Sequence, residues 1–559
     1  MKKTTIILGA ILVLAFAIRV YHLHDWLYFQ ADQVRNTNHA HKILEHGWEG
    51  VPLLGPKAGG TDFHLGPISY YLEAVPALIF GLNHPAVIVY SNLFFVLASI
   101  LLVYYFLRQG FSKNTSLQIT TLYAFSYVVI QYSRFSWNPN SLLFWGLLFI
   151  LTTYKIFEED TKGKGWCLLT LILSYGVVSQ LHTTALLGYP GIFGMYFLYQ
   201  MLKGEDGLVI KNFSVFKERV AKFLKSIGWK YWLGAMSVLF VMYTPIIIYD
   251  IQNNGHNTQE FIKALLGKTA SDKTVIEKLY REMNLMGKYY SLNVFSLNYK
   301  EVFWSSNKKM GVINLLGLSL VLGTMWIIGY FKIRKKDGKK IIRLVEKNNF
   351  LVLNFIWWLV FSILFFPLAY KLDQMRFWFS AFLIPYICLA IIFEWLKFKK
   401  NGKALVVVMV LFILLLNLSA VTNWYIGLAK QDGQNRFYRR PMTSTLQQSD
   451  WVTYEKMNEV VKYMSEQSGE KVSCFRAPSK NRASYRYIFE HNYPESEGRV
   501  LRGKIVVSDL EKCEVYLIKH SKKITADIIA NYKKDGKIIE LGSPQKFGVI
   551  TVWKVSGLK

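Results

Sequence analysis

The chain has 559 residues, of which 52% are hydrophobic, 16% are aromatic and only 18% are charged. This composition excludes an ordinary soluble protein, because too few polar side chains remain to cover a water-exposed surface. A net charge of +29 would suggest nucleic-acid binding in a soluble chain. Here much of the excess lies in short loops between apolar segments, where Lys and Arg retain loops in the cytoplasm. We therefore expect a multi-pass membrane protein that binds no nucleic acid.

Eleven segments are long and apolar enough to be transmembrane helices, which need about 20 residues. They cover approximately residues 4–23, 86–107, 115–133, 139–157, 165–182, 184–202, 231–250, 312–331, 349–369, 377–396 and 404–425. The stretch 66–82 is also apolar, but it contains Glu73 and two prolines. We interpret it as an interfacial or re-entrant helix, since a full span there would invert the topology of everything after it.

The distribution of Lys and Arg supports this topology. With a cytoplasmic N-terminus, most basic clusters fall on inside loops, and the short outside loops hold chiefly Arg134, Lys371 and Arg376. This positive-inside asymmetry places the C-terminal region outside the cytoplasmic membrane. The first apolar run is also compatible with a cleavable signal peptide. The following loop lies outside whether or not this run is cleaved.

Two connecting segments show the spacing of amphipathic helices. Apolar side chains recur between Phe216 and Ile227 opposite lysines and an arginine, which is typical of a helix on the anionic cytoplasmic leaflet, although a solvated linker is the alternative. A similar apolar stripe runs from Ile276 to Met286. This second helix is expected to lie on the outer membrane face or to cover a cavity.

The composition becomes polar after about residue 427. Strand-like runs at 471–475, 504–507 and 515–518 alternate with helical stretches at 452–465 and 526–533. We therefore predict a membrane domain of residues 1–427, with a first extracytoplasmic loop at 21–85, and a soluble extracytoplasmic α/β domain of residues 428–559. Of the four cysteines, only Cys474 and Cys513 lie outside apolar runs, so only they are candidates for a disulfide.

The first outside loop is the most unusual part of the chain, because it holds seven of the eleven histidines together with several carboxylates. Ionisable groups this close to a bilayer are candidates for function. The stretch 31–46 contains neither Pro nor Gly and predicts a helix. Its spacing places Asp32, Arg35 or Asn36, and His39 on one face. A carboxylate in this position is a candidate general base.

These residues lead to a family resemblance. An early Asp in residues 29–35 (FQADQVR), followed by 52–56 (PLLGP) and 63–72 (FHLGPISYYL), resembles bacterial members of glycosyltransferase family 39. That family belongs to the GT-C superfamily, which includes the protein O-mannosyltransferases and the lipid A aminoarabinose transferase. The resemblance covers the membrane region and is strongest over the first 140 residues.

The resemblance implies a GT-C fold and a transferase that moves one sugar from a polyprenyl-phosphate carrier to an acceptor at the outer membrane face. The acceptor is a lipid, a cell-wall glycan or a protein. The family's catalytic Asp maps onto Asp32. Many relatives have an Asp-Glu pair there, whereas this chain has Gln33, and Asp62 is the candidate for the second carboxylate. Attack opposite the leaving phosphate would invert the anomeric centre.

Cations near the outer surface would stabilise the phosphate that leaves. The candidates are Arg134, Lys371 and Arg376, and charges that reach toward lipid headgroups are the alternative for each. Other candidate substrate contacts are polar groups of the first loop and of outer helix ends, namely Arg35, His39, His64, Asn138 and His182. A structural hydrogen bond is the alternative for His182.

A divalent metal is compatible with the histidine density. His22 and His24, or His39 and His41, together with Asp32 or Asp62, have side chains that suit zinc or manganese. Their spacing matches no closed motif, so the sequence leaves metal dependence open. Otherwise these histidines contact headgroups or the sugar.

Three other functions compete with the transferase. A transporter or flippase of a lipid-linked or anionic substrate would place ionisable residues near the membrane midplane, but here they concentrate outside. A polymerase or ligase of lipid-linked glycans would be expected to use a long loop late in the membrane region. A sensor would not need eleven spans to anchor one small domain.

Overall fold

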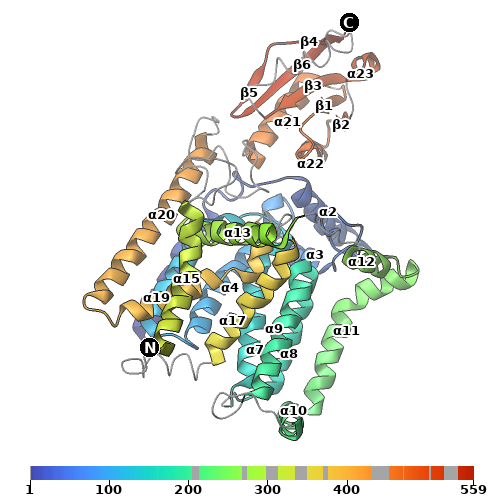
Figure 1. Cartoon of the computed structure of the whole chain (residues 1–559). Helices are drawn as coiled ribbons and strands as arrows, with labels where there is room; N and C mark the ends of the chain where they lie inside the picture. Colours follow the sequence, from blue (N-terminus) through green and yellow to red (C-terminus); the bar gives the residue numbers. More distant parts are fainter. Residues whose placement is uncertain are drawn as a thin grey trace.

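The computed structural model describes residues 2–159, 161–203, 213–266, 273–296, 312–333, 349–368, 375–430, 452–469, 471–502, 505–520 and 539–558. A large helical region carries a small α/β domain at one end (Figure 1). The first half of the helical region comprises α1 (Lys2–Val20), α2 (Ala31–His46), η1 (Gly47–Gly50), α3 (Ile68–Phe80), η2 (Pro85–Ile88), α4 (Val89–Leu107), α5 (Lys113–Ala124), α6 (Tyr127–Ser133), η3 (Asn138–Ser141), α7 (Leu142–Phe157), α8 (Lys164–Leu181) and α9 (Thr183–Leu202). The second half comprises α10 (Phe213–Ile227), α11 (Trp229–Gln252), α12 (His256–Leu266), α13 (Val275–Phe295), α15 (Val312–Ile333), α17 (Asn349–Phe365), η4 (Phe366–Leu368), α18 (Met375–Trp378), η5 (Phe379–Ala381), α19 (Ile384–Leu396) and α20 (Gly402–Lys430).

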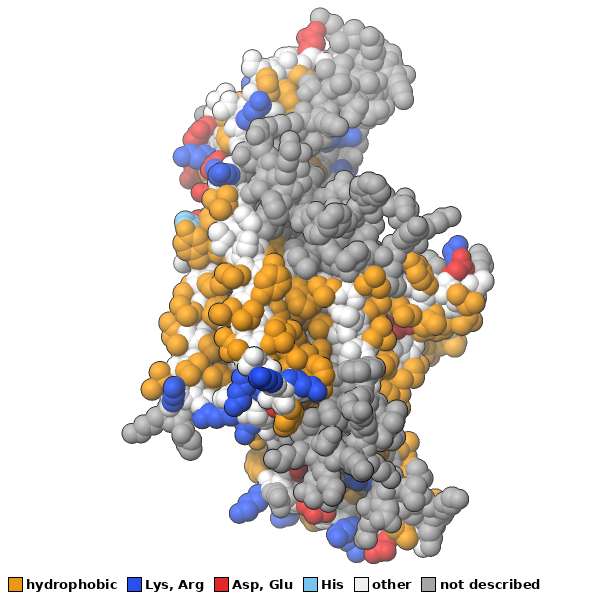
Figure 2. All heavy atoms as spheres, turned by 60° about the vertical axis from the view of Figure 1, so that its left-hand side comes forward, with side chains coloured by type: hydrophobic (Ala, Val, Ile, Leu, Met, Phe, Trp, Pro, Cys, Tyr) orange, Lys and Arg blue, Asp and Glu red, His pale blue; other side chains and the backbone are white. Residues whose placement is uncertain are grey.

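Six helical stretches in the described ranges are long and apolar enough to cross a membrane: Lys3–Val20, Pro85–Leu107, Asn138–Phe157, Lys164–Leu181, Trp229–Gln252 and Gly402–Lys430. Met375–Ala381 and Ile384–Leu396, bent by 51°, make a seventh if they form one span. Figure 2 shows a broad hydrophobic band with Lys and Arg gathered beneath it. The multi-pass helical architecture is therefore confirmed, and the number of eleven spans stays a prediction.

The predicted span 115–133 is wrong as a single helix, because the chain breaks into α5 and α6 at Phe125 and Ser126. Side chains from other helices satisfy the backbone at the break. The amide of Tyr127 donates to Asn417 Oδ1 at 2.9 Å, and the hydroxyl of Ser126 donates to the carbonyl of Asn293 at 2.9 Å. The sequence gives no sign of these partners, which lie far along the chain.

Three shorter helices fall where the sequence predicts them. The apolar stretch 66–82 forms α3, whose 13 residues extend only about 20 Å at 1.5 Å per residue and are too short for a membrane span. Both amphipathic patterns form helices, α10 and α13. Phe223 of α10 is buried among the helices, whereas Ile276 of α13 is exposed.

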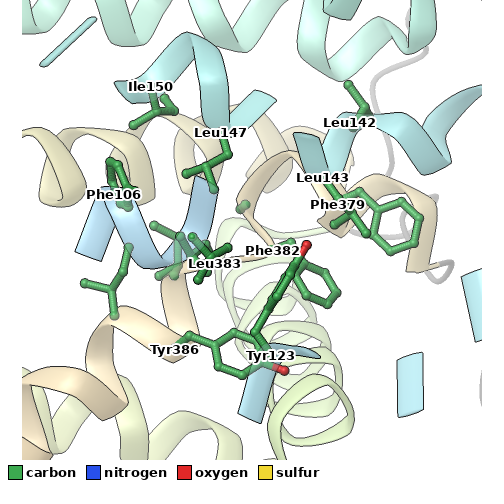
Figure 3. Close-up of a cluster of buried hydrophobic side chains, with 14 of the residues drawn as sticks. Phe106, Tyr123, Leu142, Leu143, Leu147, Ile150, Phe379, Phe382, Leu383 and Tyr386 are labelled. Atoms are coloured by element: carbon green, nitrogen blue, oxygen red, sulfur yellow. The ribbon is translucent and has the colours of Figure 1, made fainter. Parts of the chain in front are cut away.

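The helical core is built from large aromatic and aliphatic side chains. Figure 3 shows Phe106 of α4, Tyr123 of α5, Leu147 of α7 and Tyr386 of α19 converging in one cluster, and each of these side chains is buried. The hydroxyl of Tyr123 lies 2.7 Å from that of Ser99, so its polar end is satisfied inside the core.

The C-terminal domain is a mixed sheet flanked by helices. It contains α21 (Tyr454–Ser468), β1 (Ser473–Arg476), α22 (Arg482–Asn492), β2 (Gly498–Val500), α23 (Val507–Lys512), β3 (Glu514–Lys519), β4 (Ile539–Leu541), β5 (Gln545–Phe547) and β6 (Ile550–Leu558). The strand order is β2-β1-β3-β6-β4, with β5 paired to β6. β1 runs parallel to β2 and β3, with Ser473 opposite Gly498 and Glu514, and β6 runs antiparallel to β3, with Lys554 opposite Tyr516. The predicted α/β class is confirmed, and the domain boundary at residues 427 and 428 stays a prediction.

Three sequence predictions for this domain have different outcomes. Cys474 and Cys513 form the predicted disulfide. The strand expected at 504–507 is wrong, because Val507 begins α23 and the amide of Val506 donates to Asp509 Oδ2 at 2.8 Å. The helix expected at 526–533 lies outside the described residues.

Candidate functional site

A cavity of about 840 Å³, lined by both charged and apolar side chains, lies where the first loop meets the ends of several helices. Asp32 and Arg35 reach it from α2, Asp62 from the loop before α3, Asn138 from η3, His182 from the junction of α8 and α9, Glu260 from α12, and Arg376 from α18. Six of these seven residues are sequence-predicted candidates, and the structure brings them together from segments more than 300 residues apart.

Helix α2 presents a carboxylate held by a cation. The helix occupies the predicted range, because residues 31–46 contain no helix breaker and Gly47 ends it with a positive φ of 55°. Arg35 Nη1 donates to Asp32 Oδ1 at 2.9 Å, and both side chains remain partly exposed toward the cavity. The spacing of three residues therefore forms the predicted pair on one helix face.

A buried polar network supports this pair from behind. Asn36 Oδ1 accepts hydrogen bonds from Arg35 Nε at 3.3 Å and from Nη2 at 3.0 Å, while its Nδ2 donates to the hydroxyl of Ser136 at 2.9 Å. Asn36 and Ser136 are both buried. The carboxyl group of Glu73, also buried, interacts with the side chains of both. Asn36 thus holds the Nε and Nη2 edge of the Arg35 guanidinium, while Nη1 donates to Asp32.

Asp62 lies on a tight turn at the cavity rim. Lys57 pairs with His64 in an isolated antiparallel bridge, and Gly60 takes a φ of +80° at the tip of the turn. Lys57 Nζ donates to Asp62 Oδ1 at 2.8 Å. This contact lowers the pKa of Asp62 and raises the pKa of Lys57. Because the Asp62 side chain is 71% exposed, it is less constrained than Asp32.

Another part of the cavity lining combines a cation with aromatic rings and a histidine. The Arg376 guanidinium lies over the rings of Trp137, at 5.4 Å, and Phe377, at 5.0 Å, and it interacts electrostatically with Asp32. His182 Nδ1 accepts the amide of Thr184, so in the neutral ring the proton lies on Nε2, which is left as a donor. This part of the lining can bind an anion and donate a hydrogen bond to a sugar oxygen.

Sequence reasoning missed three charged residues of the cavity: Lys57, Glu260 and Lys263. The last two lie on α12, and Lys263 Nζ donates to Glu260 Oε1 at 2.7 Å. Their spacing of three residues in a helical pattern is visible in the sequence, but only tertiary packing shows that α12 covers this cavity.

Three other sequence candidates that the structure describes do not line this cavity. His39 stacks on Tyr70 at 4.2 Å, and burial together with Arg35 and Lys42 lowers its pKa to about 4. Arg134 is buried and donates to the carbonyl groups of Arg19 and Tyr21, each at 2.7 Å. Neither residue lines the cavity.

His64 lies on the other side of the loop, and Lys371 lies outside the described residues. The Nδ1 atom of His64 is 2.8 Å from the carbonyl oxygen of Gly55, and its amide donates to Asn257 Oδ1 at 2.8 Å. His64 lines a second, mostly apolar cavity of about 580 Å³ between α8, α11 and α12. Phe63, Leu65, Leu186 and Phe261 line both cavities.

The loop histidines have partners other than a shared ion. Among the described residues, no three His, Cys, Asp or Glu side chains converge in a way that could hold a metal. His22 contacts Asp25 at 2.8 Å, His24 contacts Tyr90 at 2.7 Å, and His41 contacts Tyr487 at 3.0 Å. The two His-x-His pairs therefore form no metal centre with Asp32 or Asp62 in this structure.

Fold and site together define a multi-pass helical membrane protein with a carboxylate- and arginine-lined cavity beside the loop that follows its first helix. Residues 64–206 match the family model described as dolichyl-phosphate-mannose-protein mannosyltransferase, which is a GT-C mannosyltransferase family. This match confirms the resemblance at the level of the GT-C mannosyltransferase family, while the motifs at residues 29–35 and 52–56 lie outside the matched range.

The chain is similar to several solved structures, two of which illustrate the likeness. One is the archaeal oligosaccharyltransferase AglB from Archaeoglobus fulgidus in complex with an inhibitory peptide and a dolichol-phosphate, with 13% sequence identity, a TM-score of 0.49, and coverage of 94% of this chain and 70% of that chain. The other is ArnT from Cupriavidus metallidurans bound to undecaprenyl phosphate, with 9% identity, a TM-score of 0.45, and coverage of 98% and 97%. None of the curated proteins matches the chain.

Proposed function

We propose that this protein is an integral-membrane glycosyltransferase that moves one sugar from a polyprenyl-phosphate donor to a lipid, glycan or protein acceptor, with inversion. Transfer takes place on the outer face of the cytoplasmic membrane of a bacterium, with the N-terminus inside and the C-terminal domain outside. The observation that carries the proposal is the meeting of Asp32 and Arg376 across one cavity. A base and an anion-binding group that line the same cavity suit this reaction.

Asp32 acts as the general base. An acceptor hydroxyl is a poor nucleophile, and a positioned carboxylate that takes its proton in the transition state accelerates attack on the anomeric carbon by about 10² to 10⁴ fold. Arg35, at 2.9 Å, keeps the carboxylate oriented toward the cavity. The bond from the anomeric carbon to the phosphate oxygen breaks as the new glycosidic bond forms.

Arg376 receives the leaving polyprenyl phosphate, which gains negative charge as that bond breaks. A guanidinium over the rings of Trp137 and Phe377 is held in one orientation, and such preorganised charge lowers the transition-state energy. His182 and Asn138 are placed to contact the sugar. The apolar second cavity, which shares wall residues with the first, accommodates the start of the polyprenyl chain.

Bridging of Cys474 and Cys513 supports an extracytoplasmic C-terminal domain, since disulfides persist in oxidising compartments. Thiol labelling tests this orientation. In intact cells, a reagent that cannot cross the membrane should label these two cysteines only after a reductant that also stays outside has been added. Because both cysteines are buried, protection under both conditions would place the domain inside only if the same reagents label them after the membrane is permeabilised.

Sugar transfer in proteoliposomes tests the reaction. We expect a panel of polyprenyl-phosphate sugars to contain a donor, and Asp32→Asn, which nearly preserves shape, to lower the transfer rate by about 10² to 10⁴ fold. Asp25→Asn is the matched control, because the Asp25 side chain is 50% exposed, pairs with His22 at 2.8 Å and does not line the cavity, and we expect it to retain transfer. Full activity of Asp32→Asn would refute its role as base. Absence of transfer from every donor by the folded protein would favour a transporter instead.

A further inference from the structure

The segment that leads into α2 is bonded to the C-terminal domain through its backbone. Tyr28 pairs with Thr453 in an isolated antiparallel bridge, and the amide of Tyr454 donates to the carbonyl of Leu27 at 3.0 Å. At the first residue of α2, the amide of Ala31 donates to the carbonyl of Lys480 at 3.2 Å. The residue that follows in the chain is Asp32. The domain therefore fixes the backbone directly before the proposed base.

Helix α22 adds two side-chain contacts to the same region. The hydroxyl of Ser484, which is fully buried, donates to the carbonyl of Phe29 at 2.9 Å. One turn further along, the hydroxyl of Tyr487 lies 3.0 Å from His41 Nε2 in the middle of α2. Figure 1 shows α22 above α2 at the junction of the two regions. None of the four residues in these two contacts lines the cavity.

An apolar core is shared across this junction. The ring of Phe29 packs edge-on against Tyr454, at 5.4 Å, and against Tyr487, at 5.1 Å. Val34 and Ala40 of α2 belong to the same buried cluster as residues of α21, α22 and the sheet. Such a continuous core is typical of parts of one folding unit and unlike the more polar surface between loosely tethered domains.

We propose that Ser484 and Tyr487 of α22 are positioning residues of the transferase, through which the C-terminal domain fixes α2 and thereby the Asp32 carboxylate. The inference rests on the proposed role of Asp32 as base. Its physical reason is the sensitivity of proton transfer to geometry, since a displacement of about 1 Å can lower a rate by about 10² fold. The domain thus acts on the reaction without touching the substrate.

Matched variants within the domain separate positioning from general destabilisation. Tyr487→Phe removes the hydroxyl that faces His41, whereas Tyr485→Phe removes a hydroxyl that faces His520 inside the domain at 2.8 Å. Ser484→Ala removes the donor to Phe29. Its control, Ser473→Ala, removes an equally buried hydroxyl that contacts Ser468 and Met464 within the domain.

The first readout needs no activity. Hydrogen exchange of the full-length protein in detergent should be about fivefold faster over residues 28–46 in Ser484→Ala and Tyr487→Phe, as expected for the loss of one hydrogen bond of about 1 kcal/mol. The two controls should leave exchange in that segment unchanged. Unchanged exchange in both test variants would overturn the proposal.

The second readout is the division between kcat and KM. In the test variants we expect kcat to fall about fivefold or more while KM stays within about twofold, and we expect the controls to retain kcat. Faster exchange with unaltered kcat would overturn the link to the reaction, as would an equal fall of kcat in the controls. Full activity of Asp32→Asn would instead refute the proposed function, and the exchange result would still stand by itself.

Discussion

Substituting Asn36 with Ala should weaken the transferase without touching the cavity. Asn36 Oδ1 accepts two N–H groups of Arg35, at 3.3 Å and 3.0 Å, and its Nδ2 donates to Ser136 at 2.9 Å. Hydrogen bonds to charged groups contribute about 1.5 to 3 kcal/mol. Because the Arg35 side chain is 35% exposed, hydrogen bonds to water would replace part of this free energy in the variant. We therefore expect a loss of about 1 to 2 kcal/mol in the orientation of Arg35 and Asp32.

Converted at about 1.4 kcal/mol per tenfold, this loss predicts a transfer rate about 5 to 30 times lower, measured as kcat in proteoliposomes. The control is Asn354→Ala, which removes another buried asparagine whose Nδ2 donates to the carbonyl of Phe350 in its own helix, remote from the cavity. A rate for Asn36→Ala within twofold of the parent protein, or an equal loss in the control, would show that the buried network does not orient Asp32.

Three further predictions concern stability. Arg134→Lys should lower the melting temperature in detergent far more than it lowers the transfer rate, because a single ammonium cannot replace the guanidinium that donates to several backbone carbonyls. Cys474→Ser, which opens a loop of 39 residues, should destabilise the C-terminal domain by about 4 kcal/mol, measured by denaturant unfolding; an unchanged midpoint would contradict this. Burial beside His24 lowers the pKa of His84 from 6.5 to about 4. The contribution of neutral His84 to the free energy of unfolding is therefore complete above pH 6.5 and is lost as the pH falls toward 4. This amounts to about 3 kcal/mol at most, and His84→Gln should flatten the pH dependence of the melting temperature in this window.

The sequence predicts local structure well where one physical signal dominates. Helix α2 matches the predicted range because no residue between Ala31 and His46 breaks a helix. Helical spacing places Arg35 or Asn36 beside Asp32, and in the structure Arg35 forms the ion pair. The disulfide follows by elimination, since the other two cysteines lie in apolar runs. These inferences need no knowledge of tertiary contacts.

The parts that escaped prediction depend on contacts between distant segments. At the break between α5 and α6, the amide of Tyr127 donates to Asn417, which lies almost 300 residues later in the chain. The charged residues of α12 reach the cavity only because that helix packs over the first loop. The docking of α22 against α2 depends on the match of two surfaces. A hydrophobic period shows that a face is buried, but it does not show which partner buries it.

Gln33, the neighbour of the proposed base, has both ends of its side-chain amide hydrogen-bonded. Gln33 is buried, its Nε2 donates to the carbonyl of Ser136 at 2.7 Å, and its Oε1 accepts the amide of Gln30 at 3.1 Å. A glutamate in the same place would set one carboxylate oxygen against the carbonyl oxygen of Ser136, and a buried charge without a hydrogen-bond donor is unfavourable. Position 33 therefore contributes an amide that holds the start of α2. The carboxylate that this end of the helix presents to the cavity is that of Asp32, while Asp62 and Glu260 reach the cavity from other segments.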